Sequence, residues 1–537
     1  MIEELLSGIS PSRTVLGVSL ALFIVFWVMK LRVAHQIQSL GGKSPEIPTH
    51  LPVAADFIFR SLKAAKKNQD LAFWQKAFVN AQQAHKLPSV PYTAEINQLI
   101  SNRLVFTIDP ENIKALLTGQ FNDFGKGETF HREWREFLGD SIFATDGEMW
   151  SASRHLIRPM FTRDRIVDTE IFETNVQKLI RLFGGSAAPN GTKIVDVGGL
   201  YFRYTLDAST DYLLGKGTDS LENPTTRFAE AFRYVQSRQA QYFRMGPLSG
   251  FFSRRKFREE LKIMDDFLQP YIETVLSLTP EELEKKLSKR DTFLDALARF
   301  TRDPRVLRDQ LVAVLLAGRD TTAGTLSFCT FELARNQDVV AKLREEIAER
   351  LGVGADAKIP TYADLKEMKY LNAVINETLR VYPVVPFNVR YSLHDTTLPR
   401  GGGPDGRSPI GIRGETRVVY STMLMQRDPA FCDQPPNAER YYDPAKWIPE
   451  RWTSGWQPKP WHFIPFNGGP RICIGQQFAM LEMCYTIVRI LQAYEKIVAV
   501  PRSGHDKVED PVLQFEVTLS PGAEMNCVFL RKGEGNS

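Results

Sequence analysis

Cysteine is scarce in this sequence. The 537 residues contain five cysteines, an odd number, and no two of them form a C-x-x-C pair. That pattern disfavours both a disulfide framework and a structural zinc site. We therefore expect reduced thiols in a protein that faces the cytosol, at positions Cys329, Cys432, Cys473, Cys484 and Cys527.

An excess of one charge sign is also absent. Lys and Arg number 67 against 63 Asp and Glu, which gives a formal net charge of +4. No basic stripe of the kind that binds nucleic acid is evident, so we expect no nucleic acid partner. Repeats at solenoid spacing are missing, and no Gly/Ser-rich or charged linker follows residue 52. Since 43% of the residues are hydrophobic, one large body with a sizeable core is expected.

Long hydrophobic runs are missing except near the N-terminus. Residues 15–29, VLGVSLALFIVFWVM, have only Gly17 and Ser19 as non-apolar members, and Lys30 and Arg32 close the run. As a helix the run spans about 22 Å, short of the ~30 Å hydrocarbon core of a membrane. Flanking residues extend it, and the basic side chains can snorkel to the headgroups.

The apolar run is expected to be a single-pass membrane anchor. A cleaved signal peptide is the alternative, but Glu3 and Glu4 precede the run, and basic residues occupy the place of a cleavage site. Basic residues after the run place the bulk of the protein in the cytoplasm. We expect residues 1–36 to be the anchor, residues 37–52 a Pro/Gly hinge, and residues 53–537 one domain.

Apolar residues at three- and four-residue spacing predict a mostly helical chain from about residue 55 to 390. The longest helical run is 306–335. Residues 416–420 and 512–519 are typical of short strands, and the Gly/Pro-rich segment 401–409 of a loop. The predicted class is mainly α with small β-sheets.

One cysteine lies in a constrained loop. Residues 466–475 read FNGGPRICIG, and a helix-like segment, 476–494, follows. The glycines and Pro470 favour a tight turn, while Gly475 allows a flat partner to approach the backbone. Arg471 and the helix N-terminus would favour a Cys473 thiolate. Such a thiolate can be an axial haem ligand or a nucleophile, and an inert buried thiol is the alternative.

The spacing Phe466-x-x-Gly469-x-Arg471-x-Cys473-x-Gly475 resembles the haem-ligand loop of the cytochromes P450, the haem-thiolate monooxygenases. The resemblance covers about residues 45 to 530. It implies the cytochrome P450 fold, a haem b cofactor, and Cys473 as the axial ligand of the haem iron.

A second motif is AGRDTTAGT, residues 317–325. In a buried helix the small residues would leave a notch with an acid and a hydroxyl beside it, although a simple helix kink is the alternative. The motif resembles the oxygen-activating groove of the same family. That resemblance implies that Thr321 positions a proton donor, that Asp320 links it to solvent, and that Cys473 pushes electron density onto iron.

Glu377 and Arg380 are three residues apart on a helix predicted to stop before Pro383, so their side chains share one face. At a surface such a pair would contribute little. The pair resembles the Glu-x-x-Arg element of the family, which implies a third member, Arg451, and a structural triad that supports the cysteine loop.

Trp150 and Arg154 lie four residues apart, which places an indole N–H and a guanidinium on one helix face. This geometry suits two carboxylates, and plain packing is the alternative. By resemblance the carboxylates would be haem propionates, with Arg390 and Arg471 as further partners.

The residues expected to line the pocket are apolar, which favours a lipophilic substrate, although all of them can equally be ordinary core. They are Leu311, Val312, Leu315, Leu316, Val384, Val385, Pro386, Phe387 and Val389. The phrases GRDTTAGTLSFCTFELARN, RYSLHDTTLPRGGG and FNGGPRICIGQQFAM resemble the fungal subgroup that hydroxylates n-alkanes and fatty acids.

The resemblance implies an enzyme that inserts one oxygen atom from O2 into a terminal or subterminal C–H bond of a long aliphatic substrate. Alternatives are the same chemistry on the alkyl chain of a polyketide or peptide, a non-oxygenating isomerase or dehydratase, and a haem-binding sensor. Electrons would come from NADPH through a separate reductase. The expected location is the endoplasmic reticulum membrane, with residues 234–257 as a second membrane contact or a solvated basic loop.

Overall fold

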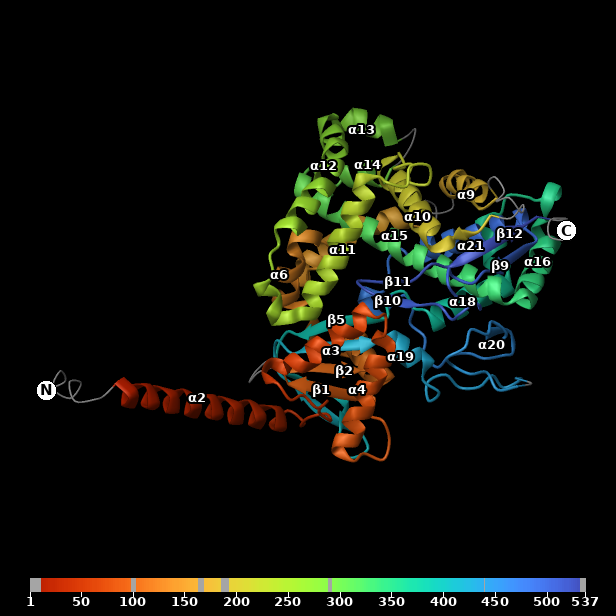
Figure 1. The fold of residues 1–537 in the computed structure, drawn as a ribbon. Coiled ribbons are helices and arrows are strands. Elements are labelled where there is room, and N and C mark those ends of the chain that lie inside the picture. Colours follow the sequence, from red (N-terminus) through yellow and green to blue (C-terminus); the bar gives the residue numbers. More distant parts are fainter. Residues whose placement is uncertain are drawn as a thin grey trace. The chain divides into compact units, whose positions relative to one another are not determined.

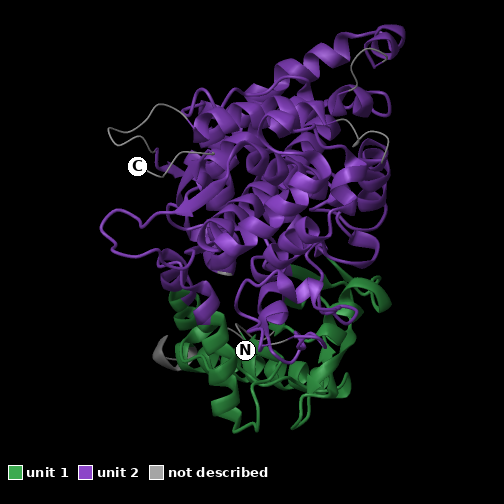
Figure 2. Cartoon of the chain, turned by 90° about the vertical axis from the view of Figure 1, so that its right-hand side faces the viewer, with its two compact units in different colours: residues 1–60, 74–125, 389–420 green, residues 61–73, 126–388, 421–537 purple. Residues whose placement is uncertain are grey.

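The computed structural model describes residues 11–97, 103–162, 169–184, 193–287, 292–438 and 440–531. Helices dominate and the sheets are small, which confirms the predicted class (Figure 1). The chain divides into two compact units (Figure 2). The first comprises residues 1–60, 74–125 and 389–420, and the second comprises residues 61–73, 126–388 and 421–537.

The first unit holds most of a five-stranded sheet, in which the strand order is β1-β2-β8-β5-β3. β1 and β2 are antiparallel with Thr93 opposite Thr107, and β2 pairs with β8 in parallel. The strands are β1 (Thr93–Asn97), β2 (Arg103–Thr107), β3 (Phe124–Gly125), β5 (Phe387–Ser392) and β8 (Arg417–Ser421).

The Gly/Pro-rich segment 401–409 contains the predicted loop in its middle, residues 403–407, while its two ends are strand residues. It forms the end of a hairpin between β6 (Thr396–Gly402) and β7 (Ser408–Ile412), with a register shift between Leu398 and Gly402. Gly401 has a φ of +123°, and a Cβ there would lie 2.9 Å from Thr93. Glycine is therefore needed inside the irregular strand, because a side chain would be strained and would clash.

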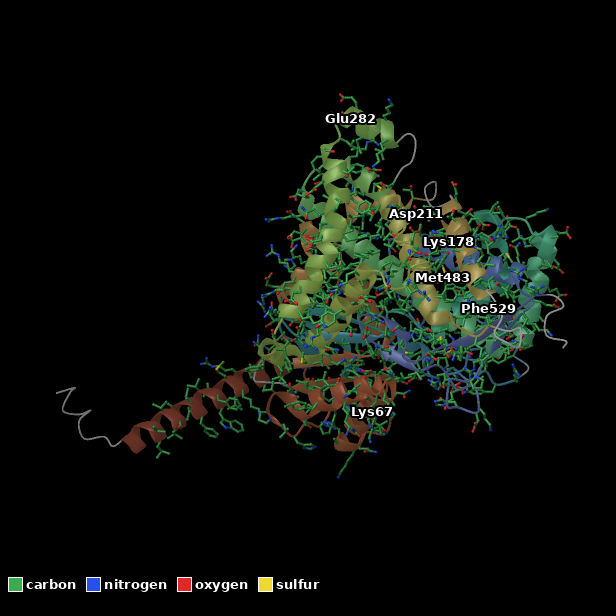
Figure 3. The ribbon with its side chains drawn as sticks, turned by 45° about the horizontal axis from the view of Figure 1, so that its top comes forward. Lys67, Lys178, Asp211, Glu282, Met483 and Phe529 are labelled. Atoms are coloured by element: carbon green, nitrogen blue, oxygen red, sulfur yellow. The ribbon has the colours of Figure 1, made fainter. Side chains whose placement is uncertain are left out.

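The N-terminal run forms the long helix α2 (Pro11–Ser39), which extends beyond residues 15–29 on both sides. Residues 15–32 are exposed throughout, and Figure 3 shows their side chains projecting from the helix. Of the part of the chain that the structure describes, α2 is the one helix long and apolar enough to cross a membrane.

The segment after α2 is hydrogen-bonded to the first unit. Gly411 of β7 donates to the Gly42 carbonyl at 2.9 Å, and Ile47 donates to the Glu95 carbonyl of β1 at 2.8 Å. The Glu95 carboxylate accepts from the Ser44 amide at 3.0 Å and pairs with Arg103. Part of the predicted hinge, residues 42–47, is thus attached to strands.

The second unit is built around α15 (Pro304–Arg335), in which the predicted run 306–335 is confirmed. The helix begins where Asp303 accepts hydrogen bonds from the amides of Arg305 and Val306, directly before Pro304. Most of its side chains are buried on every face, as in a helix at the centre of a core. α10 (Val197–Leu214), α12 (Arg255–Ser277) and α21 (Gln476–Ala493) pack against it.

Residues 512–519 were predicted to form one strand, but they contribute to a hairpin of β10 (Leu513–Phe515) and β11 (Leu519–Pro521). The strand is interrupted because Glu516 and Thr518 form the turn.

A second sheet has the order β4-β12-β9, with β4 (Val195–Asp196), β9 (Lys496–Ala499) and β12 (Asn526–Leu530). The remaining helices are α3 (Ala55–Lys66), α4 (Asp70–His85), α5 (Pro110–Lys114), α6 (Gly127–Leu138), α7 (Gly147–Ile157), α9 (Glu170–Phe183), α11 (Arg227–Met245), α13 (Pro280–Leu287), α14 (Phe293–Ala298), α16 (Gln337–Leu351), α17 (Tyr362–Glu367), α18 (Lys369–Val381), α19 (Thr422–Arg427) and α20 (Glu450–Thr453).

Candidate active site

The cysteine loop is closed by its own backbone. The Cys473 amide donates to the Phe466 carbonyl at 2.9 Å, and a short 3₁₀ turn, Gly469–Arg471, lies between them. Gly469 has a φ of +64°, which favours glycine in the turn. A Cβ on Gly468 would lie 2.6 Å from the Trp461 ring, so the close approach of that ring requires glycine there. α21 begins at Gln476, three residues after the cysteine.

The Cys473 side chain is exposed, yet protein atoms surround the sulfur closely enough to desolvate it. Burial raises the pKa of Cys473, while the Gly475 amide and the charge of Arg154 oppose the rise. The expected lowering of the thiol pKa by Arg471 is wrong, because Arg471 pairs with Asp146 instead.

Three of the predicted carboxylate binders gather beside this loop. The Arg471 guanidinium lies 4.6 Å from the centre of the Trp150 ring, and that of Arg154 lies 6.0 Å from it. Arg154 donates to the Ile472 carbonyl, next to Cys473, at 3.1 Å. Arg471 donates to the Thr145 carbonyl at 2.9 Å and to Asp146 at 2.5 Å. The structure thus brings together α7 and the cysteine loop.

The fourth predicted binder, Arg390, lies on β5 in the first unit. It is buried and donates to the Val389 carbonyl at 2.9 Å. Its place beside the other three residues stays a prediction.

The acid of the AGRDTT motif is enclosed. Asp320 is 1% exposed, and its carboxylate contacts Arg319 at 3.0 Å and accepts from Gln236 of α11. Burial raises the pKa of Asp320, and these two partners oppose the rise. Asp320 therefore has no direct contact with solvent, and any link to solvent runs through its partners.

The hydroxyl and the small residues of the motif are also engaged. Thr321 donates to the Ala317 carbonyl one turn earlier, at 2.6 Å, a bond that weakens the helix locally. A Cβ on Gly318 would lie 3.1 Å from the Ser209 hydroxyl oxygen, so α10 packs closely on this side of α15. On that side the expected notch is occupied by α10.

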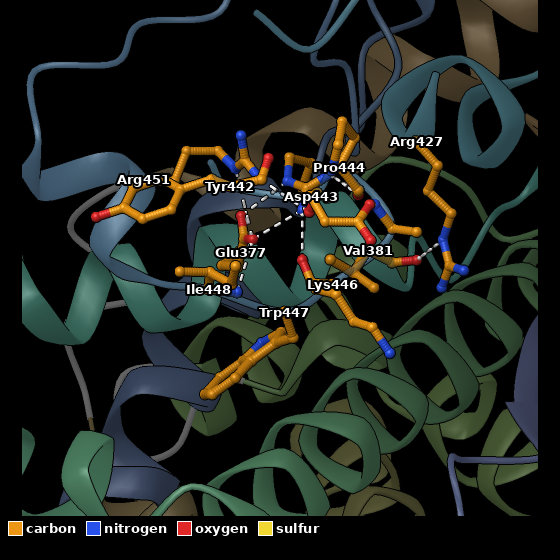
Figure 4. A network of polar contacts seen from close by, with 12 residues as sticks. Glu377, Val381, Arg427, Tyr442, Asp443, Pro444, Lys446, Trp447, Ile448 and Arg451 are labelled. Carbon is orange, nitrogen blue, oxygen red and sulfur yellow. Dashed lines mark hydrogen bonds and ion pairs between the residues drawn. The ribbon is translucent and has the colours of Figure 1, made fainter. Parts of the chain in front are cut away.

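Glu377 is the centre of a buried polar network (Figure 4). Its carboxylate accepts two hydrogen bonds from Arg380, at 2.7 and 2.8 Å, and lies 3.7 Å from Arg451 Nε. Trp452 Nε1 and the Ile448 amide also donate to it, at 3.0 and 2.9 Å. All three charged side chains of the predicted triad are at most 1% exposed.

Gln426, which the sequence reasoning missed, connects this network to the cysteine loop. Its carbonyl accepts from Arg380 at 2.9 Å, and its side-chain oxygen accepts from the Ile464 amide at 3.0 Å. Ile464 lies two residues before Phe466, the first residue of the loop. No spacing rule marks Gln426, because its partners lie about 40 residues away on either side.

Comparison with known proteins identifies the family. Residues 95–521 match the family model of cytochrome P450. The chain belongs to the cytochrome P450 family. It is 43% identical over 526 residues to cytochrome P450 monooxygenase pvhE of Talaromyces variabilis, covering 95% of this chain and 94% of that protein.

Further relatives of this P450 are named cytochrome P450 52A. Cytochrome P450 52A1 of Candida tropicalis is 42% identical over 445 residues, which are 80% of this chain and 78% of the relative. Cytochrome P450 52A13 of Debaryomyces hansenii is 37% identical over 521 residues, 92% of this chain and 94% of the relative. This P450 is thus a monooxygenase, an oxidoreductase that uses haem, O2, a substrate and an external electron supply.

The residues of this P450 fit a haem. Within the described ranges, no three His, Cys, Asp or Glu side chains lie close enough to hold a metal ion. A metal here would take a single protein ligand, as haem iron does. A bound metal deprotonates the thiol that coordinates it, which would offset the desolvation that raises the pKa of Cys473. Two guanidinia beside it suit carboxylates.

Two further buried polar residues of this P450 were missed by the sequence reasoning. Arg319 is 6% exposed and Glu482 of α21 is 1% exposed. Burial raises the pKa of Glu482 to about 8, with a hydrogen bond to Thr322 opposing the rise. The sequence did contain a signal for both residues, because each is a charged residue within an otherwise apolar helical segment. Burying such a residue is costly unless it is paired or neutral.

Proposed function

We propose that this P450 is a membrane-bound monooxygenase that inserts one oxygen atom from O2 into a terminal or subterminal C–H bond of an n-alkane or fatty acid. The observation that supports the site is the clustering of Trp150, Arg154 and Arg471 around the Cys473 loop. When bound, a haem supplies the oxygen activation, with electrons from NADPH through a separate cytochrome reductase.

Cys473 would hold the iron of haem b as its axial thiolate ligand. Trp150, Arg154, Arg471 and Arg390 would hold the two propionate groups through charge-assisted hydrogen bonds. The buried triad of Glu377, Arg380 and Arg451 would support the cysteine loop, and the contacts through Gln426 favour this role.

Asp320 and Thr321 would move protons toward the reacting oxygen. A carboxyl whose pKa is raised by burial both accepts and releases a proton nearer neutral pH. Thr321 would orient the donor from the adjacent turn of α15, where its hydroxyl already holds a fixed direction toward the Ala317 carbonyl.

An aliphatic substrate is favoured by apolar side chains along α15 and after α18. Leu311, Val312, Leu315 and Leu316 are all buried, as is Val384. Val384 lies 3.1 Å from the place of a Cβ on Gly324 of α15, so these two segments pack closely. The resemblance of the three sequence phrases to fungal n-alkane and fatty-acid hydroxylases narrows the substrate class.

The proposed location is the endoplasmic reticulum membrane. Residues 1–36 would be the anchor, residues 37–52 the connection, and residues 53–537 the cytoplasmic haem domain. Support comes from α2, which is exposed over residues 15–32 and in which Lys30 and Arg32 follow the apolar run.

The test is product analysis by mass spectrometry. The membrane-bound full-length protein is incubated with a P450 reductase, NADPH and a graded series of n-alkanes and free fatty acids, with NADPH omitted as the control. Hydroxylated products at or near the chain end, with a chain-length optimum, are expected. NADPH oxidation without any such product would contradict the proposed substrate class. It would favour the alkyl chain of a larger metabolite as the substrate. Turnover of a lipid hydroperoxide without reductase would favour an isomerase or dehydratase.

A further inference from the structure

Arg319 is a buried cation that the proposed proton path leaves unexplained. Its guanidinium contacts two aromatic rings, 5.4 Å from the centre of the Phe202 ring and 5.3 Å from that of Phe232. Phe202 belongs to α10 and Phe232 to α11, so two different helices provide the site. Cation–π contacts reduce the cost of burying a guanidinium, but a counter-charge is still needed.

That counter-charge is the next residue, Asp320. Arg319 Nη1 lies 3.0 Å from one carboxylate oxygen, and the other oxygen accepts from Gln236 Nε2. Adjacent residues on a helix do not normally face each other. The arginine side chain is long enough for its guanidinium to contact the neighbouring carboxylate. The same guanidinium contacts the Phe202 and Phe232 rings.

A third charged group also acts on the pair, because the charge of Arg233 of α11 adds to the lowering of the Arg319 pKa by burial. Burial lowers the pKa of Arg319 and raises that of Asp320, while each partner opposes the shift of the other. An equally buried carboxyl without a cation would be neutral.

We propose that Arg319 is a positioning residue for proton delivery, which holds the Asp320 carboxylate ionised and directed toward Gln236. An ionised carboxylate takes up a proton at one oxygen and gives it up again. A carboxyl that stays neutral accepts none. This inference rests on the proposed role of Asp320 as a proton carrier.

Infrared spectroscopy of the purified full-length protein tests the proposal without turnover. The difference from Asp320→Asn isolates the stretching band of the protonated Asp320 carboxyl, which is followed with pH. In Arg319→Gln the band should persist to a pH about 1–3 units higher than in the wild type. Gln236→Leu is the matched control, because it removes a hydrogen bond and no charge, and it should shift the band less.

Arg319→Lys is the second variant, in case the glutamine variant does not fold. It keeps the charge, so its band should stay within about one unit of the wild type. Two results would overturn the proposal. One is an Asp320 band that shifts as far in Arg319→Lys as in Arg319→Gln. The other is an Asp320 band in Arg319→Gln that disappears at the same pH as in the wild type.

The coupling of NADPH oxidation to product provides the second measurement. In Arg319→Gln the coupling should fall at neutral pH and recover as the pH rises, by the same shift as the infrared band. A purely structural loss would lower the coupling equally at every pH. If the wild type oxidises no substrate, the proposed function fails, whereas the infrared measurement still decides the role of Arg319.

Discussion

Cys473 is the residue on which the haem assignment depends. Replacement by serine, Cys473→Ser, should abolish the red-shifted Soret band of the reduced carbon monoxide complex, because a hydroxyl does not supply thiolate electron density. Absorption spectra of the reduced protein with carbon monoxide measure this. Cys432→Ala, at a buried thiol in the same unit, is the control and should keep the band. A band that survives in Cys473→Ser contradicts the assignment.

Glu482 predicts a pH dependence of stability at the residue scale. The pKa of its carboxyl is about 8 in the folded chain against an ordinary value of 4.5. Between these values the folded state holds a proton that the unfolded state has lost, so stability decreases as the pH rises. The slope from this group is about 1.4 kcal/mol per pH unit at most.

Thermal unfolding of the wild type and of Glu482→Gln from pH 5.5 to 8.5 measures this contribution. The glutamine variant keeps the shape of a neutral acid and does not titrate, so its melting temperature should decline less with pH. Two curves that run parallel over this range would contradict the prediction. Other buried acids, such as Asp320, affect both proteins equally and cancel in the comparison.

At the scale of elements, the Glu377 network joins α18, the segment 442–448 and α20. Glu377→Gln leaves Arg380 and Arg451 buried without a carboxylate. Breaking a buried ion pair in this way costs about 3–5 kcal/mol, so we expect a large loss of folded, haem-loaded protein. Thermal unfolding and haem content per milligram measure the loss.

Asp266→Asn is the matched control for that network. It removes a carboxylate from the exposed Lys262–Asp266 pair on α12, whose side chains are 73% and 53% exposed. An exposed helical pair contributes about 0.5 kcal/mol or less. Equal losses in the two variants would show that the network has no special role.

At the scale of the whole molecule, the exposed apolar helix α2 predicts how the chain associates with membranes. Deleting residues 1–36 removes this helix up to Gln36 and leaves the contacts of residues 42–47 with β1 and β7. Membrane association should weaken while the carbon monoxide spectrum is retained. Sedimentation of membranes after a salt or carbonate wash measures the first, and absorption the second. Full membrane retention would assign the stronger contact to residues 234–257, where Phe251 is 85% exposed.

Helices and motifs were predictable where their causes lie within a few residues. Asp303 and Pro304 mark the start of α15, and Pro383 lies two residues after Val381, the last residue of α18. The same holds for Gly469 of the cysteine loop, whose positive φ belongs to the turn itself. The loop predicted at 401–409 is confirmed for residues 403–407, whereas Gly401 belongs to an irregular strand, which only its contact with Thr93 explains.

The amino-acid sequence was sufficient for the family and the helical class, because these follow from local spacing and residue chemistry. Tertiary packing alone decided the partners of the charged groups. Gln236 reaches Asp320 across 84 residues, and Arg471 pairs with Asp146 rather than with the thiol. A buried charge takes whichever partner the packed helices bring within a few ångströms, and spacing along the chain does not encode that choice.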